Sequence, residues 1–313
     1  MRRRTSGVGL DIGSYSIKLV QLEPVGKSYR LGSYGEVATP SGAIESGLIQ
    51  DREAVAHAID QLFQDMGIRN RRLVTSISGQ QVYIKTLSLP WMRKRELKPA
   101  VYYQVATWSS LPVEEMVIDF AVYHENRTAR EIKVLVVAVH QSVIENLLVV
   151  LELAELVAEV IDIEPLALYR VLRSQDEGRG LLVIDIGAAS TQFSLFQGQR
   201  LSFVRSVGRG GNPGKMASDS DLTLMGQEMA AEVFRTLEYY EVQYSEAIVD
   251  KVVLTGGGSA GEQLRESMQA HLPYTVEEGD VVVGLNGLDE EEKEELRYRY
   301  GLALGLAARE VIL

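Results

Sequence analysis

The chain of 313 residues contains no cysteine, only two tryptophans and only eight prolines. The absence of cysteine excludes disulfide bonds, thiolate zinc sites and a cysteine nucleophile, and it is compatible with the reducing cytosol. The four histidines are scattered through the chain without the spacing of metal ligands. With 46% hydrophobic and 24% charged residues, the composition is that of a soluble protein large enough for two hydrophobic cores.

A hydrophobic run long enough to cross a membrane is also missing. Residues 7–22 follow a basic N-terminus but contain Asp11 and Lys18, which excludes a signal peptide. The most apolar later stretch, residues 144–163, is interrupted by five acidic residues and predicts an amphipathic helix followed by a strand. We therefore expect a cytoplasmic protein without direct membrane insertion.

Positive charge is in short supply, because the net charge is −11. An acidic surface repels phosphate backbones, so nucleic acid is not expected as a principal partner. Two basic clusters occur, at residues 69–72 and 93–95. We interpret both as solvated loop charge rather than as anion sites.

What the sequence does contain is an internal duplication. The segment VGLDIGSYS (residues 8–16) returns as LVIDIGAAS (residues 182–190), with an offset of 174 residues between Asp11 and Asp185. This offset suits two similar domains. In each copy a hydrophobic strand ends in the turn Asp-Ile-Gly-x-x-Ser, and two further strands are expected at residues 17–22 and 29–38 and at residues 192–196 and 200–207. Each half is thus predicted to open with an antiparallel three-stranded meander.

The elements after each meander predict a layered α/β architecture with two lobes and a cleft between them. Helices at residues 53–66 and 225–242 return to buried strands at 72–78 and 251–255. Residues in between do not repeat and predict a small α+β insertion, and a last helix is expected at 289–313. The predicted domains are a first lobe (6–80, with 288–313 returning to it), an insertion (81–160) and a second lobe (161–287).

The duplicated turns carry the chemistry of a phosphate site. Backbone N–H groups in a tight turn form a nest for an anion, and hydroxyls and a lysine add donors. Two carboxylates, Asp11 and Asp185, suit Mg²⁺ held through water beside a polyphosphate. The predicted ligands are Asp11, Gly13, Ser14, Ser16 and Lys18 in the first turn and Asp185, Gly187, Ala188, Ser190 and Thr191 in the second. A third element, Gly256, Gly257 and Gly258 after a strand, offers a flat surface for adenine or ribose.

These three elements resemble the phosphate-1, phosphate-2 and adenosine motifs of the actin, sugar kinase and DnaK-type chaperone superfamily. IDIEPLA (residues 161–167) resembles the helix that connects the lobes in that superfamily. The resemblance implies an actin-like (ribonuclease H-like) two-lobed fold with ATP and Mg²⁺ as ligands. Glu232 and Arg235 match the superfamily's adenosine-contacting Glu-x-x-Arg pattern.

The insertion narrows the resemblance. It follows ISGQQ (residues 77–81), as the 1C subdomain of FtsA follows a similar strand. Three segments resemble the PilM family of type IV pilus assembly proteins: TLSLPWMRKRELKPAVYYQVATWSSLPVEEMVIDFAVY (86–123), VLVVAVHQSVIENLLVVLELAEL (134–156) and VIDIEPLAL (160–168). The resemblance implies a cytoplasmic ATP-binding scaffold with other pilus-assembly proteins as partners.

The same resemblance implies how the protein reaches the inner membrane. The cytoplasmic N-terminal tail of a PilN-like protein is expected to lie as an extended peptide in a groove near the insertion. FtsA-type proteins continue into an amphipathic membrane helix, whereas this chain ends at Leu313 inside the last predicted helix. Attachment is therefore expected to come from the partner, at the periphery of the inner membrane.

One departure and two alternatives stay open at this stage. After residues 205–212 the family's extended helical segment is replaced by a short polar run with Pro213 and Gly214, which predicts a shortened small subdomain in the second lobe. Hydrolysis needs a group that positions water; Asp185 and Gln80, with Gln81, are the candidates, and they support at most a weak ATPase. The alternatives are an FtsA-like polymerising division protein and an actin-fold ATPase or kinase, although no substrate-side aspartate base is evident for a kinase.

Overall fold

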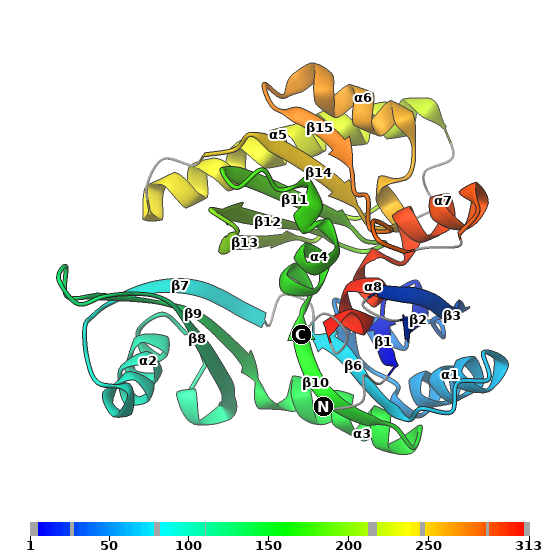
Figure 1. Cartoon of the computed structure of the whole chain (residues 1–313), viewed down its shortest axis with the longest axis horizontal. Coiled ribbons are helices and arrows are strands. Elements are labelled where there is room, and N and C mark those ends of the chain that lie inside the picture. The colour runs from blue at the N-terminus through cyan, green and yellow to red at the C-terminus, as the bar shows by residue number, and fades with distance from the viewer. Residues whose placement is uncertain are drawn as a thin grey trace.

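The computed structural model describes residues 6–25, 28–77, 82–109, 111–211, 218–244, 248–285 and 288–309. These residues form two five-stranded sheets, one in each half of the molecule, and a three-stranded sheet that projects to one side (Figure 1). A short hairpin of β4 (Ile44–Glu45) and β5 (Leu48–Ile49) completes the pairing. The arrangement is the two-lobed α/β fold that the sequence predicts.

The first sheet has the strand order β10-β6-β1-β2-β3. Its meander consists of β1 (Gly7–Ile12), β2 (Ser16–Val25) and β3 (Ser28–Ala38), which pair antiparallel. The strands β6 (Arg72–Ile77) and β10 (Val157–Ile163) then add parallel to β1. The residues of β1 and β6 that face the layers of helices are fully buried, as expected for strands covered on both sides.

The second sheet repeats this order as β13-β12-β11-β14-β15. Its strands are β11 (Gly180–Ile186), β12 (Thr191–Gln197), β13 (Arg200–Val207), β14 (Lys251–Thr255) and β15 (Thr275–Glu278). The register is repeated too, because Asp185 faces Gln192 in the second sheet as Asp11 faces Lys18 in the first. The structure thus confirms the duplication and both meanders.

Helices cover the outer face of each sheet (Figure 1). The first sheet is covered by α1 (Arg52–Asp65) and α3 (Gln141–Leu153), and the second by α5 (Asp219–Gln243) and α6 (Glu262–His271). The start of α1 is fixed by Asp51, whose side chain accepts a hydrogen bond from the backbone N–H of Ala54 at 3.0 Å. Its apolar residues recur at helical spacing and are buried against the sheet.

The helix α4 (Glu164–Leu172) connects the lobes and packs against α8 (Gly301–Ala307). At this crossing a Cβ on Gly305 would overlap the backbone carbonyl of Ala167, so only glycine allows such close packing. Asp162, at 4% exposure, accepts hydrogen bonds from Arg170 (2.9 Å) and Arg309 (2.6 Å). This buried charge cluster ties the end of β10 to α4 and to the C-terminal segment.

The prediction of one continuous helix over residues 289–313 is wrong, because the helix is interrupted at Tyr300. The backbone of Tyr300 (φ −113°, ψ 8°) ends α7 (Glu290–Arg299) and precedes α8. The Tyr300 side chain is 2% exposed and packs edge-on against Tyr34, with ring centroids 5.1 Å apart. Burying this ring in the first lobe redirects the chain, which periodicity alone did not reveal.

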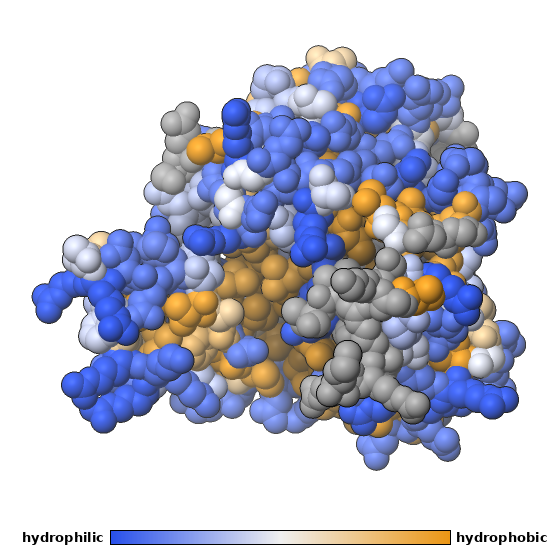
Figure 2. All heavy atoms as spheres, viewed as in Figure 1, coloured by the Kyte–Doolittle hydropathy of each residue, from blue (hydrophilic) through white to orange (hydrophobic). Residues whose placement is uncertain are grey.

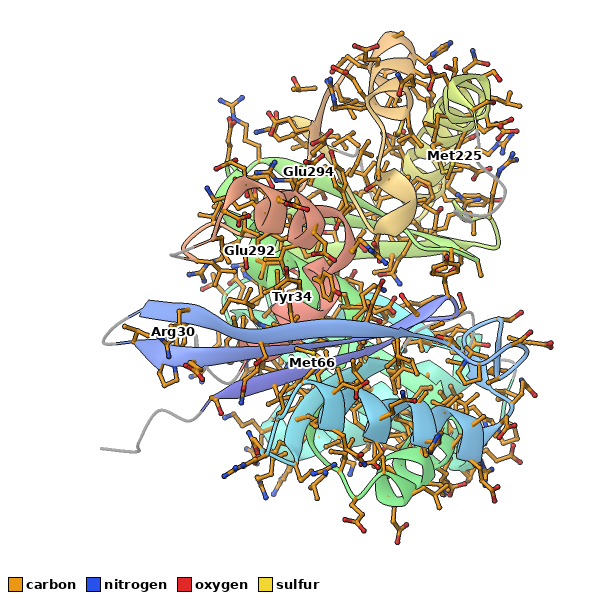
Figure 3. All side chains as sticks on the ribbon, turned by 90° about the vertical axis from the view of Figure 1, so that its right-hand side faces the viewer. Arg30, Tyr34, Met66, Met225, Glu292 and Glu294 are labelled. Carbon is orange, nitrogen blue, oxygen red and sulfur yellow. The ribbon has the colours of Figure 1, made fainter. Side chains whose placement is uncertain are left out.

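The helix α7 lies over the first sheet beside the cleft. Figure 3 shows Tyr34 on the side of β3 toward α7, which carries Glu292 and Glu294, and Met66 on the opposite side toward α1. The hydroxyl of Tyr34 donates to Glu295 at 3.1 Å. Burial, together with this carboxylate, raises the pKa of Tyr34 to about 12. The contact anchors α7 to the first lobe.

The insertion has its own small core. Its sheet has the order β7-β9-β8, with β7 (Val82–Pro90), β8 (Met116–Asn126) and β9 (Glu131–His140), and one face packs against α2 (Lys94–Trp108). The predicted range of the insertion runs to residue 160, but α3 and β10 pack with the first lobe. The strands of the insertion therefore end at His140, 20 residues before the predicted boundary.

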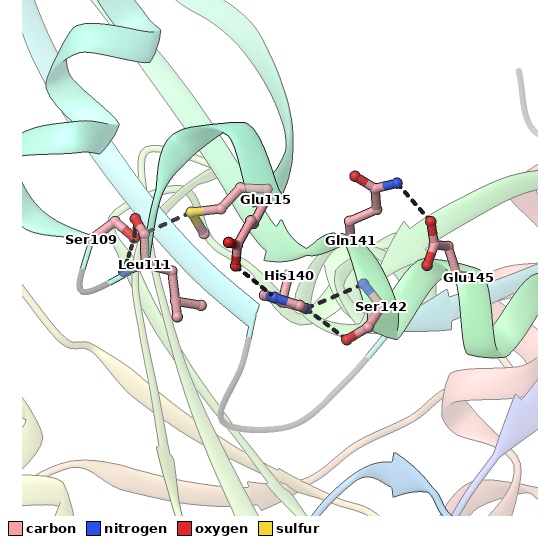
Figure 4. A network of polar contacts seen from close by, with 8 residues as sticks. Ser109, Leu111, Glu115, His140, Gln141, Ser142 and Glu145 are labelled. Atoms are coloured by element: carbon pink, nitrogen blue, oxygen red, sulfur yellow. Dashed lines mark hydrogen bonds and ion pairs between the residues drawn. The ribbon is translucent and has the colours of Figure 1, made fainter.

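His140 forms the joint between the insertion and the first lobe. Its Nδ1 accepts a hydrogen bond from the backbone N–H of Ser142 at 3.2 Å and so caps α3. Its Nε2 lies 3.5 Å from the carboxylate of Glu115, at the base of the insertion (Figure 4). One side chain thus contacts both sides of the joint.

Three short 3₁₀ helices complete the described elements. They are η1 (Val113–Glu115), η2 (Arg173–Gln175) and η3 (Gly257–Ser259).

Candidate functional site

A cleft of about 590 Å³ lies between the two large sheets. The two duplicated turns face each other across it, and the glycine triplet after β14 forms part of its wall. The predicted site residues that line the cleft are Asp11, Gly13, Ser14, Ser16, Lys18, Asp185, Gly187, Ala188, Ser190, Gly256, Gly257 and Gly258. Residues 174 positions apart in sequence therefore meet in one site.

The two turns have the same internal geometry. The N–H of Gly13 donates to the carbonyl of Ser16 at 3.2 Å, and the N–H of Gly187 donates to the carbonyl of Ser190 at 2.9 Å. A threonine hydroxyl ties each turn to a neighbouring segment: Thr39 donates to Gly13 O in the first turn at 2.6 Å, and Thr191, directly after the second turn, donates to Arg209 O at 2.7 Å. Thr191 was predicted as a ligand, but it is fully buried and supports the turn instead of lining the cleft.

Two carboxylates and one lysine meet between the turns. Lys18 Nζ lies 3.5 Å from the carboxylate of Asp11, and both side chains are about 15% exposed. Burial raises the pKa of Asp185 to about 7; the charge of Asp11 adds to this effect and Lys18 opposes it. Negative charge is therefore costly at Asp185 without a further cation, and a bound Mg²⁺ would supply one.

The glycine triplet gives the second lobe a flat wall. A Cβ on Gly256 (φ +89°) would collide with the carboxylate of Asp185 and the carbonyl of Ile186. At Gly257, by contrast, nothing lies within 4 Å of the position of a Cβ. The wall is thus open to a ligand at Gly257 and tightly packed just before it.

Two buried polar atoms in the cleft wall have no hydrogen-bond partner among the described residues: Thr255 Oγ1 and Gln192 Oε1. Buried polar atoms are normally paired. The fit to a phosphate-bearing ligand rests on the open wall at Gly257 and on the facing turns, which line the cleft.

Two predicted adenosine contacts lie elsewhere. Glu232 is on α5 and accepts hydrogen bonds from Arg205 at 2.7 Å and from Arg235. Although burial acts to raise it, these two guanidinium groups hold the pKa of Glu232 below its usual value. Neither Glu232 nor Arg235 lines the described cleft. Gln80, the second catalytic candidate, and Gln81 lie outside the described residues.

Sequence reasoning missed several residues of the cleft. Glu164 begins α4 and accepts a hydrogen bond from Gln192 Nε2 at 3.2 Å; both residues line the cleft. The repeat could have revealed Gln192, because it occupies the register of Lys18. Tyr298 and Arg299 reach the cleft from the end of α7, where no motif marked them.

Two negative findings concern only the described part of the chain. It contains no group of three or more His, Asp or Glu side chains arranged to hold a metal ion. Mg²⁺ would therefore depend on Asp11, Asp185 and oxygen atoms of the ligand itself. Nor does this part contain a helix with the length and apolar character needed to span a bilayer.

Two alike sheets that close on a cleft, with the two duplicated turns facing each other across it, define an actin-like two-lobed fold. The ethanolamine utilization protein EutJ from Carboxydothermus hydrogenoformans has the same fold, with a TM-score of 0.56 and 14% identity over 97% of this chain and 89% of EutJ. The family described as "Type IV pilus assembly protein PilM" matches residues 9–218. The chain belongs to the PilM family of type IV pilus assembly proteins.

Two further comparisons agree with this assignment. The solved PilM-PilN type IV pilus biogenesis complex contains a chain with a TM-score of 0.85 and 26% identity, over 98% of this chain and 99% of that one. The cell division protein FtsA of Bacillus subtilis is 26% identical over an alignment of 271 positions that covers 78% of this chain. This match spans only 60% of the length of FtsA. The predicted resemblance to PilM and the predicted fold are confirmed.

Proposed function

We propose that this protein is a cytoplasmic ATP-binding scaffold of type IV pilus assembly, recruited to the inner membrane by the tail of a PilN-like protein. The observation that supports this most is the pairing of a two-turn nucleotide cleft with a PilM-type insertion in one chain. Other pilus-assembly proteins would bind the same scaffold. An FtsA-like polymerising protein is disfavoured by the family match, although the fold is shared.

The ligand of the cleft is proposed to be ATP with Mg²⁺. A volume of about 590 Å³ lies in the range of sites that enclose a nucleotide-sized ligand. The N–H groups and hydroxyls of the turns at Gly13 and Gly187 would hold phosphate oxygens from both lobes, with Lys18 at the terminal phosphate. Asp11 and Asp185 would hold Mg²⁺ through water, and the ion would neutralise charge on the phosphates. The base would lie on the wall at Gly257.

Catalysis has less support than binding. Asp185, and Glu164 with its partner Gln192, are among the polar groups that line the cleft. A carboxylate beside a hydrogen-bonded amide can orient water. We propose at most a weak ATPase, in which nucleotide occupancy matters more than turnover.

The groove for the partner tail is proposed on the face of the insertion that turns away from α2. Ile84, Leu135 and Val137 on this face are half-buried and pack in part against the core of the first lobe. Val117, at 42% exposure, lies on the neighbouring strand of the same face. Figure 2 shows a hydrophobic hollow between the insertion and the body of the molecule. An exposed apolar hollow of this kind suits an extended peptide.

The strand β13 offers a route between the cleft and the insertion. Its C-terminal residues Ser206 and Val207 line the cleft. Near its other end, the carbonyl of Ser202 accepts a hydrogen bond from Thr86 of β7 at 2.8 Å, and the guanidinium of Arg200 lies 5.7 Å from the ring centroid of Tyr123. Movement of the second lobe on nucleotide binding would therefore shift the insertion and change the affinity for the tail.

Calorimetry of Mg·ATP binding tests the nucleotide proposal. The wild-type protein should bind, and Gly257→Glu should not, because the new side chain would occupy the open wall on which the base is proposed to lie. Asp11→Ala should weaken the binding of ATP and of Mg²⁺ together, because Asp11 is proposed to hold the ion beside the phosphates. The control is Gln61→Glu, which adds the same charge at an exposed position of α1 outside the cleft. A folded wild-type protein without measurable binding would refute the proposal and leave a nucleotide-free adaptor.

A second titration tests the partner. A fluorescent peptide with the N-terminal sequence of a PilN-like protein should bind in solution, and its affinity should differ with and without Mg·ATP. The variant Leu135→Glu places a charge in the groove and should abolish peptide binding while Mg·ATP still binds. Unchanged peptide affinity in this variant would rule out the proposed groove.

A further inference from the structure

Positively charged side chains cluster at the end of the insertion that lies far from the lobes. Residues 91–98 and 125–131 hold six of the chain's 32 Lys and Arg residues against three of its 43 acidic residues. The six are Arg93, Lys94, Arg95, Lys98, Arg127 and Arg130, and all are exposed. We call these two segments the basic tip. The whole chain has a net charge of −11, so the charge of the basic tip is opposite in sign to that of the chain as a whole.

Both segments of the basic tip belong to one surface. The N–H of Trp91 donates to the carbonyl of Arg130 at 2.8 Å, which joins the end of β7 to the turn between β8 and β9. The insertion projects from the lobes in Figure 1, and Figure 2 shows hydrophilic side chains standing out from that end. The sequence pattern alone indicated only a solvated loop at residues 93–95. The structure adds the arginines of the hairpin beside it.

The acidic residues of the basic tip are largely occupied within it. Glu125 accepts hydrogen bonds from Trp91 Nε1 at 2.8 Å and from Arg127 Nε at 3.1 Å. Glu96 accepts from the backbone N–H of Arg93 at 3.1 Å and so caps α2. Hydrogen bonds from Trp91 and Arg127, with the nearby charge of Lys94, keep the pKa of Glu125 below its usual value. The outward charge that remains is positive.

Trp91 adds an aromatic component to the basic tip. It is 38% exposed, and the guanidinium of Arg127 lies 5.5 Å from its ring centroid. Tryptophan beside Lys and Arg is the composition found at the headgroup level of bilayers, where the ring meets acyl chains and the cations meet phosphates. We propose that the basic tip of the insertion binds the anionic headgroups of a phospholipid bilayer.

A bilayer fits this surface better than nucleic acid does. The proposed partner tail emerges from a membrane and lies in a groove of the same insertion, so the tip would be held beside lipid at high effective concentration. This step rests on the proposed function. The acidic lobes interfere little, because charges farther than about 8 Å from the surface are screened at physiological salt.

The affinity expected of the basic tip for a bilayer is that of an auxiliary contact, in addition to the tether through the partner. Each Lys or Arg near an anionic bilayer strengthens binding roughly fivefold. Three residues together would therefore contribute about a hundredfold, which gives reversible binding in the absence of another anchor. The tip would orient a scaffold that its partner already tethers.

Vesicle sedimentation of the 313-residue chain without any partner tests the proposal. The wild-type protein should bind phosphatidylglycerol-containing vesicles at low salt and not bind pure phosphatidylcholine vesicles. The triple variant Arg93→Gln/Lys94→Gln/Arg95→Gln should bind about a hundredfold more weakly. The backbone cap of α2 stays intact in this variant, because it uses the N–H of Arg93.

The matched control removes the same charge elsewhere. Arg30→Gln/Arg72→Gln/Lys293→Gln changes three basic residues that pair with Glu23, Glu159 and Glu290. It should bind vesicles within a fewfold of the wild type. Equal losses in both triple variants would mean that only net charge matters, and would overturn the proposal.

Fluorescence gives an independent readout. In Trp108→Phe the only tryptophan left is Trp91, and its emission should shift to the blue and be quenched by brominated lipid. An unshifted, unquenched Trp91 in sedimented protein would exclude contact through the tip. Preference for a DNA duplex over anionic vesicles would also overturn the proposal. Loss of tail-peptide binding in solution, with vesicle binding kept, would refute the partner proposal alone.

Discussion

Asp185 should destabilise the ligand-free protein at neutral pH, and its replacement by asparagine should stabilise it. The carboxyl is half-buried in the cleft wall near the charge of Asp11, and its pKa is raised to about 7 from an ordinary value near 4. Asparagine has nearly the same shape and no charge. The variant Asp185→Asn therefore removes the cost of the buried charge.

The sign and size follow from proton linkage. The folded protein holds the proton of Asp185 more tightly than the unfolded chain, so stability falls as pH rises from about 4 to about 7 and levels off above that. A pKa raised from about 4 to about 7 corresponds to a cost of roughly 4 kcal/mol at pH 8 as an upper limit. Relaxation and hydration of the cleft reduce this, so we expect about 2 kcal/mol, and only about half as much at pH 5.5.

Urea unfolding with EDTA and without nucleotide, at pH 5.5 and pH 8, measures the effect. Asp185→Asn should exceed the wild type in the free energy of unfolding, by more at pH 8 than at pH 5.5. It should also fail to bind Mg·ATP. The control Asp65→Asn replaces an exposed carboxylate at the end of α1 and should change neither quantity. A loss of stability at pH 8, or a gain that does not depend on pH, would refute the reasoning.

Two further predictions concern the joints of the molecule. Asp162→Ala leaves Arg170 and Arg309 without their buried acceptor and should lower the free energy of unfolding by about 3 to 5 kcal/mol; urea unfolding measures this, with the exposed Glu23→Gln as a control that should cost less than about 1 kcal/mol. Thr86→Val removes the hydrogen bond to Ser202 and should leave the separate affinities for Mg·ATP and tail peptide within about twofold, while the effect of one ligand on the other falls up to about fivefold. Peptide titrations with and without Mg·ATP measure that coupling. An undiminished coupling would refute the proposal that β13 connects the cleft to the insertion.

The parts of the fold that the sequence predicted are those with strong local signals. The repeat around Asp11 and Asp185 fixed both meanders, since each alternates apolar runs with a glycine turn. The start of α7 was also predictable from the sequence, because Asp289 and Glu292 form a capping box. The backbone N–H of Glu292 donates to the Asp289 carboxylate at 2.9 Å, and the backbone N–H of Asp289 donates to the Glu292 carboxylate at 3.0 Å. These elements depend on residues close in sequence.

The errors arose where distant residues decide the outcome. The break at Tyr300 depends on burial against Tyr34, which is 266 residues earlier in the chain. The hydrophobic pattern of α3 suits a helix of the insertion or of the lobe equally, and only packing against α1 assigns it to the lobe. In the cleft, Tyr298 and Arg299 arrive from the end of the chain, without a motif.

The two lobes present different side chains to the cleft, although their sheets are duplicated. Equivalent positions of the two lobes carry Lys18, a cation, and Gln192, a neutral amide that is hydrogen-bonded to Glu164. The flat glycine wall occurs on the second lobe. A two-ended ligand meets unlike surfaces at its two ends, although the backbone that presents them is nearly the same. The shared backbone geometry would thus contact the proposed ligand from both sides, while the difference between Lys18 and Gln192 would favour one of its two orientations.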